Sequence, residues 1–218
     1  QRLSWQYPIV EFITGALFIL VFWRLFSIYH PLHTLIFAES LLSFYISVIV
    51  WLIVLVIYLA ISIIDLKHQI IPDGLNIILF LAALILIVGG FKTTFLGSYN
   101  ALFGVRDNIW LNHLIASLVA LLFFLAIYFL WEKRGIGLGD IKLAAVSGFL
   151  LGWPDIALAS ILAFTIGALV SIFLMLYKKR TIKDFIPFGP FLALGVFLVF
   201  FFGESILRFY FNFIELLT

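Results

Sequence analysis

Residues 41–65 read LLSFYISVIVWLIVLVIYLAISIID, and this stretch decides the fold class. No charged side chain interrupts it before Asp65 at its end. A helix rises about 1.5 Å per residue, so residues 41–64 are long enough to cross the roughly 30 Å hydrocarbon core of a bilayer. The stretch therefore predicts a transmembrane helix. An acid at the edge of the hydrocarbon is energetically costly, which indicates a functional role for Asp65.

Similar apolar stretches recur along the whole chain. Of its 218 residues 65% are hydrophobic and 11% are charged, whereas about 25% of residues are charged in a soluble domain. The composition predicts an all-α fold, a polytopic transmembrane helical bundle that forms one domain over residues 1–218. We expect about seven membrane segments, at 7–28, 41–64, 75–90, 110–131, 143–153, 156–177 and 188–203.

The basic residues gather on one side of this predicted topology. Alternating the segments through the bilayer places one group with the N-terminus, namely Arg2, Lys67, Lys133, Arg134, Lys142, Lys178, Lys179, Arg180 and Lys183. The smaller group on the other side is Lys92, Arg106, Arg24 and Arg208. The positive-inside rule makes the richer side cytoplasmic. Asp65 and a second acid, Asp140, then both lie at cytoplasmic helix ends.

Asp140 closes the glycine-rich loop GIGLGD at 135–140. Gly137 and Gly139 permit positive φ and close approach of other groups, so we expect a flexible mouth here. The segment that follows, 143–153, is too short to cross the bilayer as a helix. Asp140 and the nearby Lys142, in a chain so poor in charge, favour a functional loop over a plain interhelical turn.

Two proline-containing turns accompany these acids. Pro72 and Asp73 begin a strong turn signal, and we expect Asp73 to cap the N-terminus of the following helix. Pro187, Gly189 and Pro190 precede or enter the last predicted segment. These residues favour either an extended backbone that presents N–H and C=O groups to a substrate strand, or a helix start with proline in its first turn.

Residue types that are absent or scattered exclude several kinds of site. The chain has no cysteine, which rules out disulfides and thiolate metal ligands. Its four histidines form no H-E-x-x-H pattern; they are His30, His33, His68 and His113. We therefore expect no metal site and no cofactor, and no nucleic acid as a partner.

A pair of carboxyl groups suits hydrolysis of an amide bond. Two carboxyls held close together share a proton, because both cannot ionise easily. The ionised group can take a proton from water as the water attacks the carbonyl, and the protonated group can polarise that carbonyl, as in aspartic proteases. A proton-coupled transporter would also keep carboxyls beside glycine breaks. A non-catalytic membrane scaffold is a third alternative.

Three motifs stand out along the chain, namely IDLKHQIIPD at 64–73, GIGLGDIKLAA at 135–145 and IPFGPFLALG at 186–195. Together they resemble those of the type IV prepilin peptidase family, intramembrane aspartyl proteases of the G-x-G-D kind. The resemblance implies a single transmembrane peptidase domain in which Asp65 and Asp140 are catalytic. The other motif positions that it marks are Gly137, Gly139, Lys142, Pro72, Asp73, Pro187, Gly189 and Pro190.

The resemblance also implies a substrate and a location. Members of the family cut the N-terminal leader of prepilins or pseudopilins at the cytoplasmic face of the bacterial inner membrane. The expected partners are thus the leader, the substrate helix and the lipid bilayer. Presenilin-type proteases are close in chemistry, but the IIPD and PFGP motifs favour the prepilin branch.

Bifunctional members of the family differ from this chain in one respect. They carry paired C-x-x-C motifs upstream and methylate the newly exposed amine with S-adenosylmethionine. The stretch SWQYPIVEFITG at 4–15 resembles the segment that follows that region. The chain starts at Gln1 without an initiator methionine, and its first apolar run follows the polar QRLSWQYP, so we expect either a trimmed chain or the downstream part of a longer protein. The resemblance does not predict methyltransferase activity for this chain.

The predicted topology can be tested with a single introduced thiol, since the chain has none of its own. A Lys179→Cys variant should react with a membrane-impermeant maleimide only from the cytoplasmic side. Lys92→Cys, on the other side of the predicted topology, is the matched control and should react only from outside. Labelling of Lys179→Cys from outside the cell would show that the orientation is the reverse of the predicted one.

Overall fold

Seven helices make up the part of the chain that the structure describes. The computed structural model describes residues 6–29, 39–91, 93, 95–96, 108–130, 136–177 and 187–215, and over these it contains no strand. The helices are α1 (Gln6–Tyr29), α2 (Glu39–His68), α3 (Asp73–Val88), α4 (Ile109–Leu130), α5 (Leu138–Leu151), α6 (Asp155–Leu176) and α7 (Gly189–Glu215). Each coincides with one of the seven segments that the sequence predicts, which confirms the all-α fold class.

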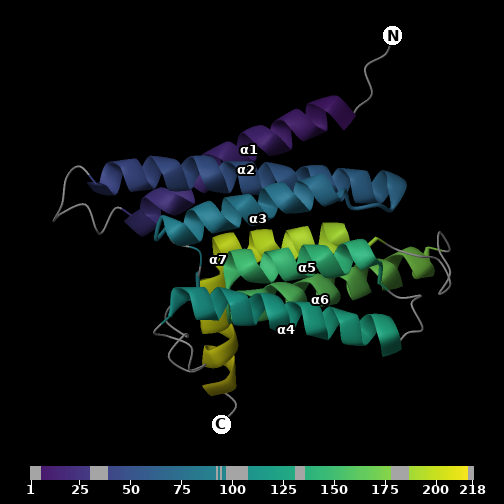
Figure 1. The fold of residues 1–218 in the computed structure, drawn as a ribbon. Helices are drawn as coiled ribbons and strands as arrows, with labels where there is room; N and C mark the ends of the chain where they lie inside the picture. Colours follow the sequence, from purple (N-terminus) through teal and green to yellow (C-terminus); the bar gives the residue numbers. More distant parts are fainter. Residues whose placement is uncertain are drawn as a thin grey trace.

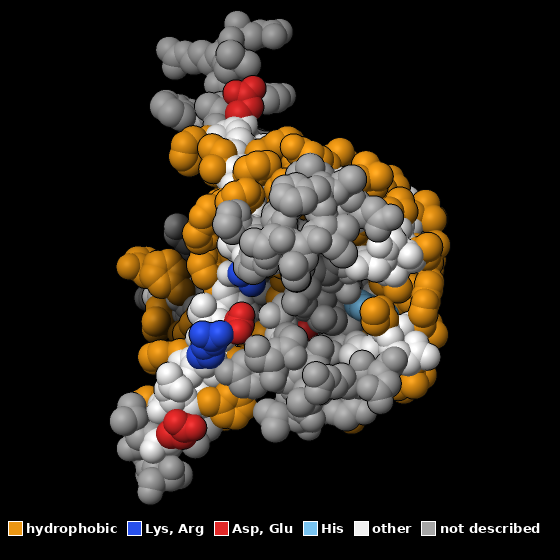
Figure 2. Space-filling view, turned by 90° about the vertical axis from the view of Figure 1, so that its left-hand side faces the viewer, with side chains coloured by type: hydrophobic (Ala, Val, Ile, Leu, Met, Phe, Trp, Pro, Cys, Tyr) orange, Lys and Arg blue, Asp and Glu red, His pale blue; other side chains and the backbone are white. Residues whose placement is uncertain are grey.

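The outer surface of the bundle is apolar. Five helices, α1, α2, α4, α6 and α7, are long and apolar enough to cross a membrane. Large hydrophobic side chains such as Phe12, Trp23 and Phe129 are more than half exposed. Among the described side chains visible at one end of the bundle, hydrophobic ones form the rim and charged ones are few (Figure 2). Such a surface suits lipid, and the chain is a multi-pass helical membrane protein.

The helices run side by side with alternating direction (Figure 1). α2 packs against α1, α3 and α7, whereas α5 packs against α3, α4, α6 and α7. The last part of α7 turns away and runs across the other helices (Figure 1). The end of α2 and the starts of α3, α5 and α7 lie at the same end of the bundle, so this end brings the sequence motifs together.

α5 and α7 show the largest differences from their predicted bounds, while α2 also runs four residues past 64 to His68. α5 begins at Leu138 rather than at 143, so Gly139 and Asp140 lie in its first turn. Gly137 precedes α5 with φ −79°, and neither glycine has a positive φ. The described part of the expected flexible mouth is therefore a helix start, while Gly135 lies outside the described residues. α7 continues to Glu215 rather than ending at 203.

Hydrogen bonds at the end of α5 remote from Asp140 hold the α5–α6 turn. Asn112 of α4 donates to the Trp153 carbonyl oxygen (3.0 Å) and accepts from the Trp153 N–H (2.7 Å). The next residue, His113, has its Nδ1 2.7 Å from the carbonyl oxygen of Phe149. A carbonyl oxygen can only accept, so the ring donates this bond. Together these bonds anchor α5 to α4 at that end.

Glycines allow neighbouring helix backbones to approach closely. A β-carbon at Gly148 of α5 would lie 2.6 Å from the carbonyl oxygen of Ala116 in α4. At Gly195 of α7 a β-carbon would overlap the carbonyl oxygen of Ala159 in α6. Small residues at helix contacts are typical of membrane bundles, where packing replaces the hydrophobic effect as the driving force.

Bulky substitutions at these two glycines should destabilise the bundle. Gly148→Leu and Gly195→Leu each force two helix backbones apart, at a cost of about 1–3 kcal/mol or more, which corresponds to a fall of several degrees in the melting temperature. Gly15→Leu is the matched control, because a β-carbon at Gly15 meets nothing within 4 Å. Thermal unfolding in detergent measures all three. Equal melting temperatures would contradict close backbone packing at these contacts.

Candidate active site

Asp65 is held by the start of α7. It lies in the last turn of α2 and is 4% exposed. Its Oδ2 accepts a 3.1 Å hydrogen bond from the backbone N–H of Gly189, the first residue of α7. The first N–H groups of a helix have no partner within the helix and carry the positive end of its dipole, which favours a carboxylate. A β-carbon at Gly189 would lie 2.6 Å from Oδ2, so this approach requires glycine.

Asp140 is held by the start of its own helix. It is the third residue of α5, and its Oδ2 accepts a 3.0 Å hydrogen bond from the N–H of Gly137. An acidic residue at this position commonly reaches back in this way. Its Oδ1 is buried and has no hydrogen-bond partner among the described residues. α5 is not among the five long membrane-crossing helices. The pKa of the Asp140 carboxyl is raised to about 6, mainly because the group is buried and to a smaller degree because of the nearby charge of Asp65.

Both aspartates line one pocket of about 280 Å³. Asp65 comes from α2 and Asp140 from α5, so residues 75 positions apart in sequence meet at one end of the bundle. The pocket lining contains six of the residues that the sequence singled out, namely Asp65, Asp73, Gly137, Gly139, Asp140 and Lys142. Two buried carboxyls beside a polar recess are an arrangement that can hold and activate a water molecule.

The third acid at the pocket, Asp73, does not have its predicted capping role. Pro72 occupies the N-cap position of α3, with ψ 127°, and no side chain caps this helix. Asp73 is the first helical residue, and its Oδ1 lies 2.8 Å from Nζ of Lys142 in α5. The two side chains are 67% and 56% exposed, so solvent weakens this salt bridge. The pair links α3 to α5 at the rim of the pocket.

The prolines of the motifs shape helix starts and do not line the pocket. Pro72 precedes α3, and Pro187 is buried just before α7. Pro190 is the second residue of α7. Of the two alternatives for residues 187–190, the structure therefore confirms the helix start with proline in its first turn. The extended backbone that would pair with a substrate strand is wrong for Gly189 and Pro190.

Ile71 belongs to the site, although it entered the sequence analysis only as part of the IIPD motif and not as a site residue. It lines the pocket and is 7% exposed. A β-carbon at Gly139 would lie 3.1 Å from Cβ of Ile71, and one at Gly189 would lie 3.4 Å from its Cδ1. Ile71 thus packs between the starts of α5 and α7. An isoleucine in so apolar a chain gives no signal in the sequence, because only the chain path between α2 and α3 brings it there.

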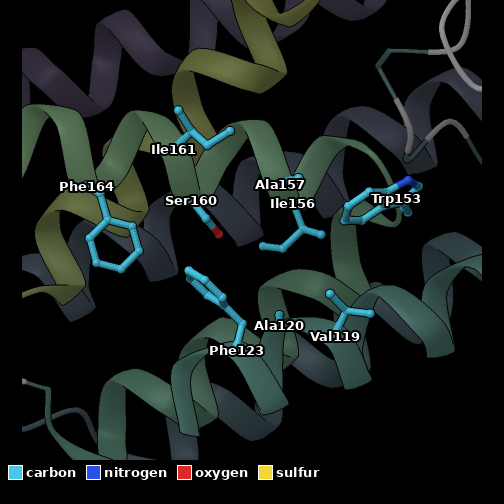
Figure 3. A pocket seen from close by; sticks show the side chains of 9 residues that line it. All are labelled: Val119, Ala120, Phe123, Trp153, Ile156, Ala157, Ser160, Ile161 and Phe164. Atoms are coloured by element: carbon cyan, nitrogen blue, oxygen red, sulfur yellow. The ribbon is translucent and has the colours of Figure 1, made fainter. Parts of the chain in front are cut away.

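A second pocket in the described structure lacks a comparable set of groups. An apolar groove of about 260 Å³ lies between α4 and α6, where side chains of the two helices face each other between Trp153 and Phe164 (Figure 3). No titratable side chain lines it. Among the described residues, no three His, Asp or Glu side chains lie close enough to hold a metal ion.

Comparison with known proteins identifies the family of this chain. The sequence model of the type IV leader peptidase family matches residues 52–172, more than half of the chain. The chain belongs to this family. The matched range contains Asp65, Asp140 and the three helices α3, α4 and α5.

Members of the type IV leader peptidase family from several bacteria are similar over nearly the whole chain. A prepilin leader peptidase/N-methyltransferase of Aeromonas salmonicida is 30% identical over 208 residues, which cover 95% of this chain and 62% of that protein. The enzyme of the same name from Stutzerimonas stutzeri is 28% identical over 218 residues, which cover 98% of this chain and 64% of the relative. This chain thus spans less than two thirds of these relatives. No solved structure gives a significant match.

Proposed function

We propose that this chain is an intramembrane aspartyl endopeptidase that removes the N-terminal leader of prepilins or pseudopilins. The observation that carries the proposal is that Asp65 and Asp140, from different helices, line one pocket. The similarity to prepilin leader peptidases supports the same substrate class. Family membership also favours a peptidase over the proton-coupled transporter that the two carboxyls alone leave open.

The surroundings of the two carboxyls suggest a division of roles. We assign Asp65 the role of the base, because the N–H of Gly189 at the start of α7 can stabilise its ionised form against the cost of burial. Burial raises the pKa of Asp140 to about 6, which suits it as the protonated partner. Its Oδ1, which lacks a partner among the described residues, is the atom placed to carry that proton toward a substrate.

Hydrolysis then adds one water molecule across the amide bond. Asp65 takes a proton from the water as its oxygen attacks the carbonyl carbon, and Asp140 donates a hydrogen bond to the carbonyl oxygen. Breakdown of the tetrahedral intermediate breaks the C–N bond. The proton held by Asp65 passes to the leaving amine, so the carboxylate and the carboxylic acid are restored.

The expected location of this reaction is the cytoplasmic face of the bacterial inner membrane. The positively charged segments of the sequence lie on the same side of the predicted topology as both aspartates. Asp65 is in the last turn of α2 and Asp140 in the first turn of α5, so both lie near the end of the bundle rather than at its middle. A leader peptide approaching from the cytoplasm would reach the pocket before the middle of the bundle.

Removing either catalytic charge should abolish cleavage without unfolding the protein. Asp65→Asn and Asp140→Asn keep the side-chain shape but remove the base or the acid, which should slow cleavage about 100-fold or more. Incubating each purified variant with a prepilin and following the leader on a gel measures this rate. Asp73→Asn is the matched control: it changes a third acid at the rim, exposed and weakly paired, and should retain most activity. Full processing by Asp65→Asn or Asp140→Asn would refute the assignment.

A methyl group at Gly189 should also impair the site. In Gly189→Ala the new β-carbon meets Oδ2 of Asp65, so the carboxylate or the start of α7 must shift. Such a displacement of the Asp65 carboxylate or of the start of α7 should lower the cleavage rate about tenfold or more. Gly74→Ala is the control, since a β-carbon at Gly74 meets nothing within 4 Å. Equal rates for the two alanine variants would show that the contact with Gly189 does not position Asp65.

A further inference from the structure

A buried hydrogen bond joins the two helices that carry the aspartates. The hydroxyl oxygen of Tyr58 in α2 lies 2.7 Å from Oγ of Ser147 in α5. Both residues are completely buried, with 0% of their surface exposed. Neither residue lines the carboxylate pocket. In an apolar bundle such a polar pair needs a reason beyond filling space, because hydrophobic side chains would do that equally well.

The position of this pair follows from the register of the two helices. Tyr58 precedes Asp65 by seven residues, and Ser147 follows Asp140 by seven residues. Seven residues make about two helical turns, so each hydroxyl lies on the same face of its helix as the aspartate and about 10 Å along the axis. Since α2 ends and α5 begins at the pocket, both spacings lead from the pocket into the bundle. The hydroxyl pair therefore lies directly behind the carboxyl pair.

Direct contact between the backbones of α2 and α5 is slight. In the described part of the chain, the helix pairs that pack substantially do not include α2 with α5. Instead α3 and α7 pack against both of them. The Tyr58–Ser147 bond is thus a direct tie between two helices that otherwise pack mainly through α3 and α7.

The direction of the hydrogen bond can be assigned. Ser147 Oγ lies 2.6 Å from the carbonyl oxygen of Leu143, to which it must donate its single hydrogen. It can then only accept from Tyr58, which is the donor. The Tyr58 ring also packs edge-on against Phe197 of α7, with ring centroids 6.4 Å apart. Removal of the hydroxyl alone should therefore leave the ring in place and leave Ser147 bonded to Leu143.

We propose that Tyr58 and Ser147 are positioning residues that set the separation of Asp65 and Asp140. The inference rests on the proposed function, because it assigns these residues to the support of a two-carboxyl reaction. Two carboxyls share a proton only at short range, and a displacement of about 1 Å can slow a positioned reaction up to about 100-fold. A tie two turns behind the pair limits how far the ends of α2 and α5 can separate.

Kinetics of Tyr58→Phe provide the first test. The variant removes one oxygen atom, and we expect kcat for prepilin cleavage to fall about tenfold or more with KM unchanged. Ser147→Ala, which removes the acceptor, should lower kcat in the same way. Ser62→Ala is the matched control, because Ser62 Oγ donates to the Tyr58 carbonyl oxygen within α2 and spans no two helices. An unchanged kcat in Tyr58→Phe, or an equal loss in the Ser62 control, overturns the proposal.

A distance measurement tests the tie without reference to activity. The chain has no cysteine, so thiols introduced as Leu66→Cys and Leu138→Cys can carry spin labels at the pocket ends of α2 and α5. Both positions are exposed, at 62% and 59%. Double electron–electron resonance should show a shifted or broader distance distribution when Tyr58→Phe is added, and no change when Ser62→Ala is added. An unchanged distribution with Tyr58→Phe overturns the proposal even if cleavage is slower.

The two readouts also separate this inference from the proposed function. If the unmodified chain cleaves no prepilin, or if Asp65→Asn is fully active, the proposed function fails. The spin-label distances are still measured in that case, and they decide by themselves whether Tyr58 and Ser147 hold α2 and α5 together. A changed distance supports the tie, and an unchanged distance removes it.

Discussion

Two backbone N–H groups at helix starts make the rest of this site possible. Carboxyl groups are costly to bury in an apolar bundle, and here each aspartate accepts one such bond, Asp65 from Gly189 and Asp140 from Gly137. The donors belong to α7 and to the turn before α5, so both helices must begin at the same end of the bundle where α2 finishes. The alternating path of the chain, the glycines at the helix starts and the packing of Ile71 between them all serve that requirement.

α7 contributes to the site although it lies outside the range that the family model matches. The family match ends at residue 172, before α7 begins. Nevertheless α7 supplies the amide that holds Asp65, and it packs against α2, α5 and α6. The first part of this helix thus belongs to the site as fully as the helices inside the matched range. Its later part turns across the bundle and is remote from the carboxyls (Figure 1).

Much of the fold could be predicted because its determinants are local. Uncharged stretches long enough to cross a bilayer specify helices, and residues such as Pro72 and Gly152, which has φ 75°, mark where they end or begin. Asp65 and Asp140 were predictable as a pair because an acid is rare and costly in such surroundings. The partner of Asp73 was not, since the choice between a cap and a salt bridge with Lys142 depends on how α3 meets α5. The sequence gives no signal for Tyr58 or Ser147 either, because neither residue type is unusual in it.

The short length of α5 has a consequence for the ion gradients across the membrane. Its 14 residues give a helix of roughly 21 Å, well short of the hydrocarbon thickness of about 30 Å. Neighbouring helices surround it, and the pocket with the two carboxyls lies at its Asp140 end. At the opposite end Asn112 and Trp153 bind each other through two hydrogen bonds and close the α5–α6 turn. Hydrolytic chemistry placed in a blind recess of this kind would leave the ion gradients across the bilayer undisturbed.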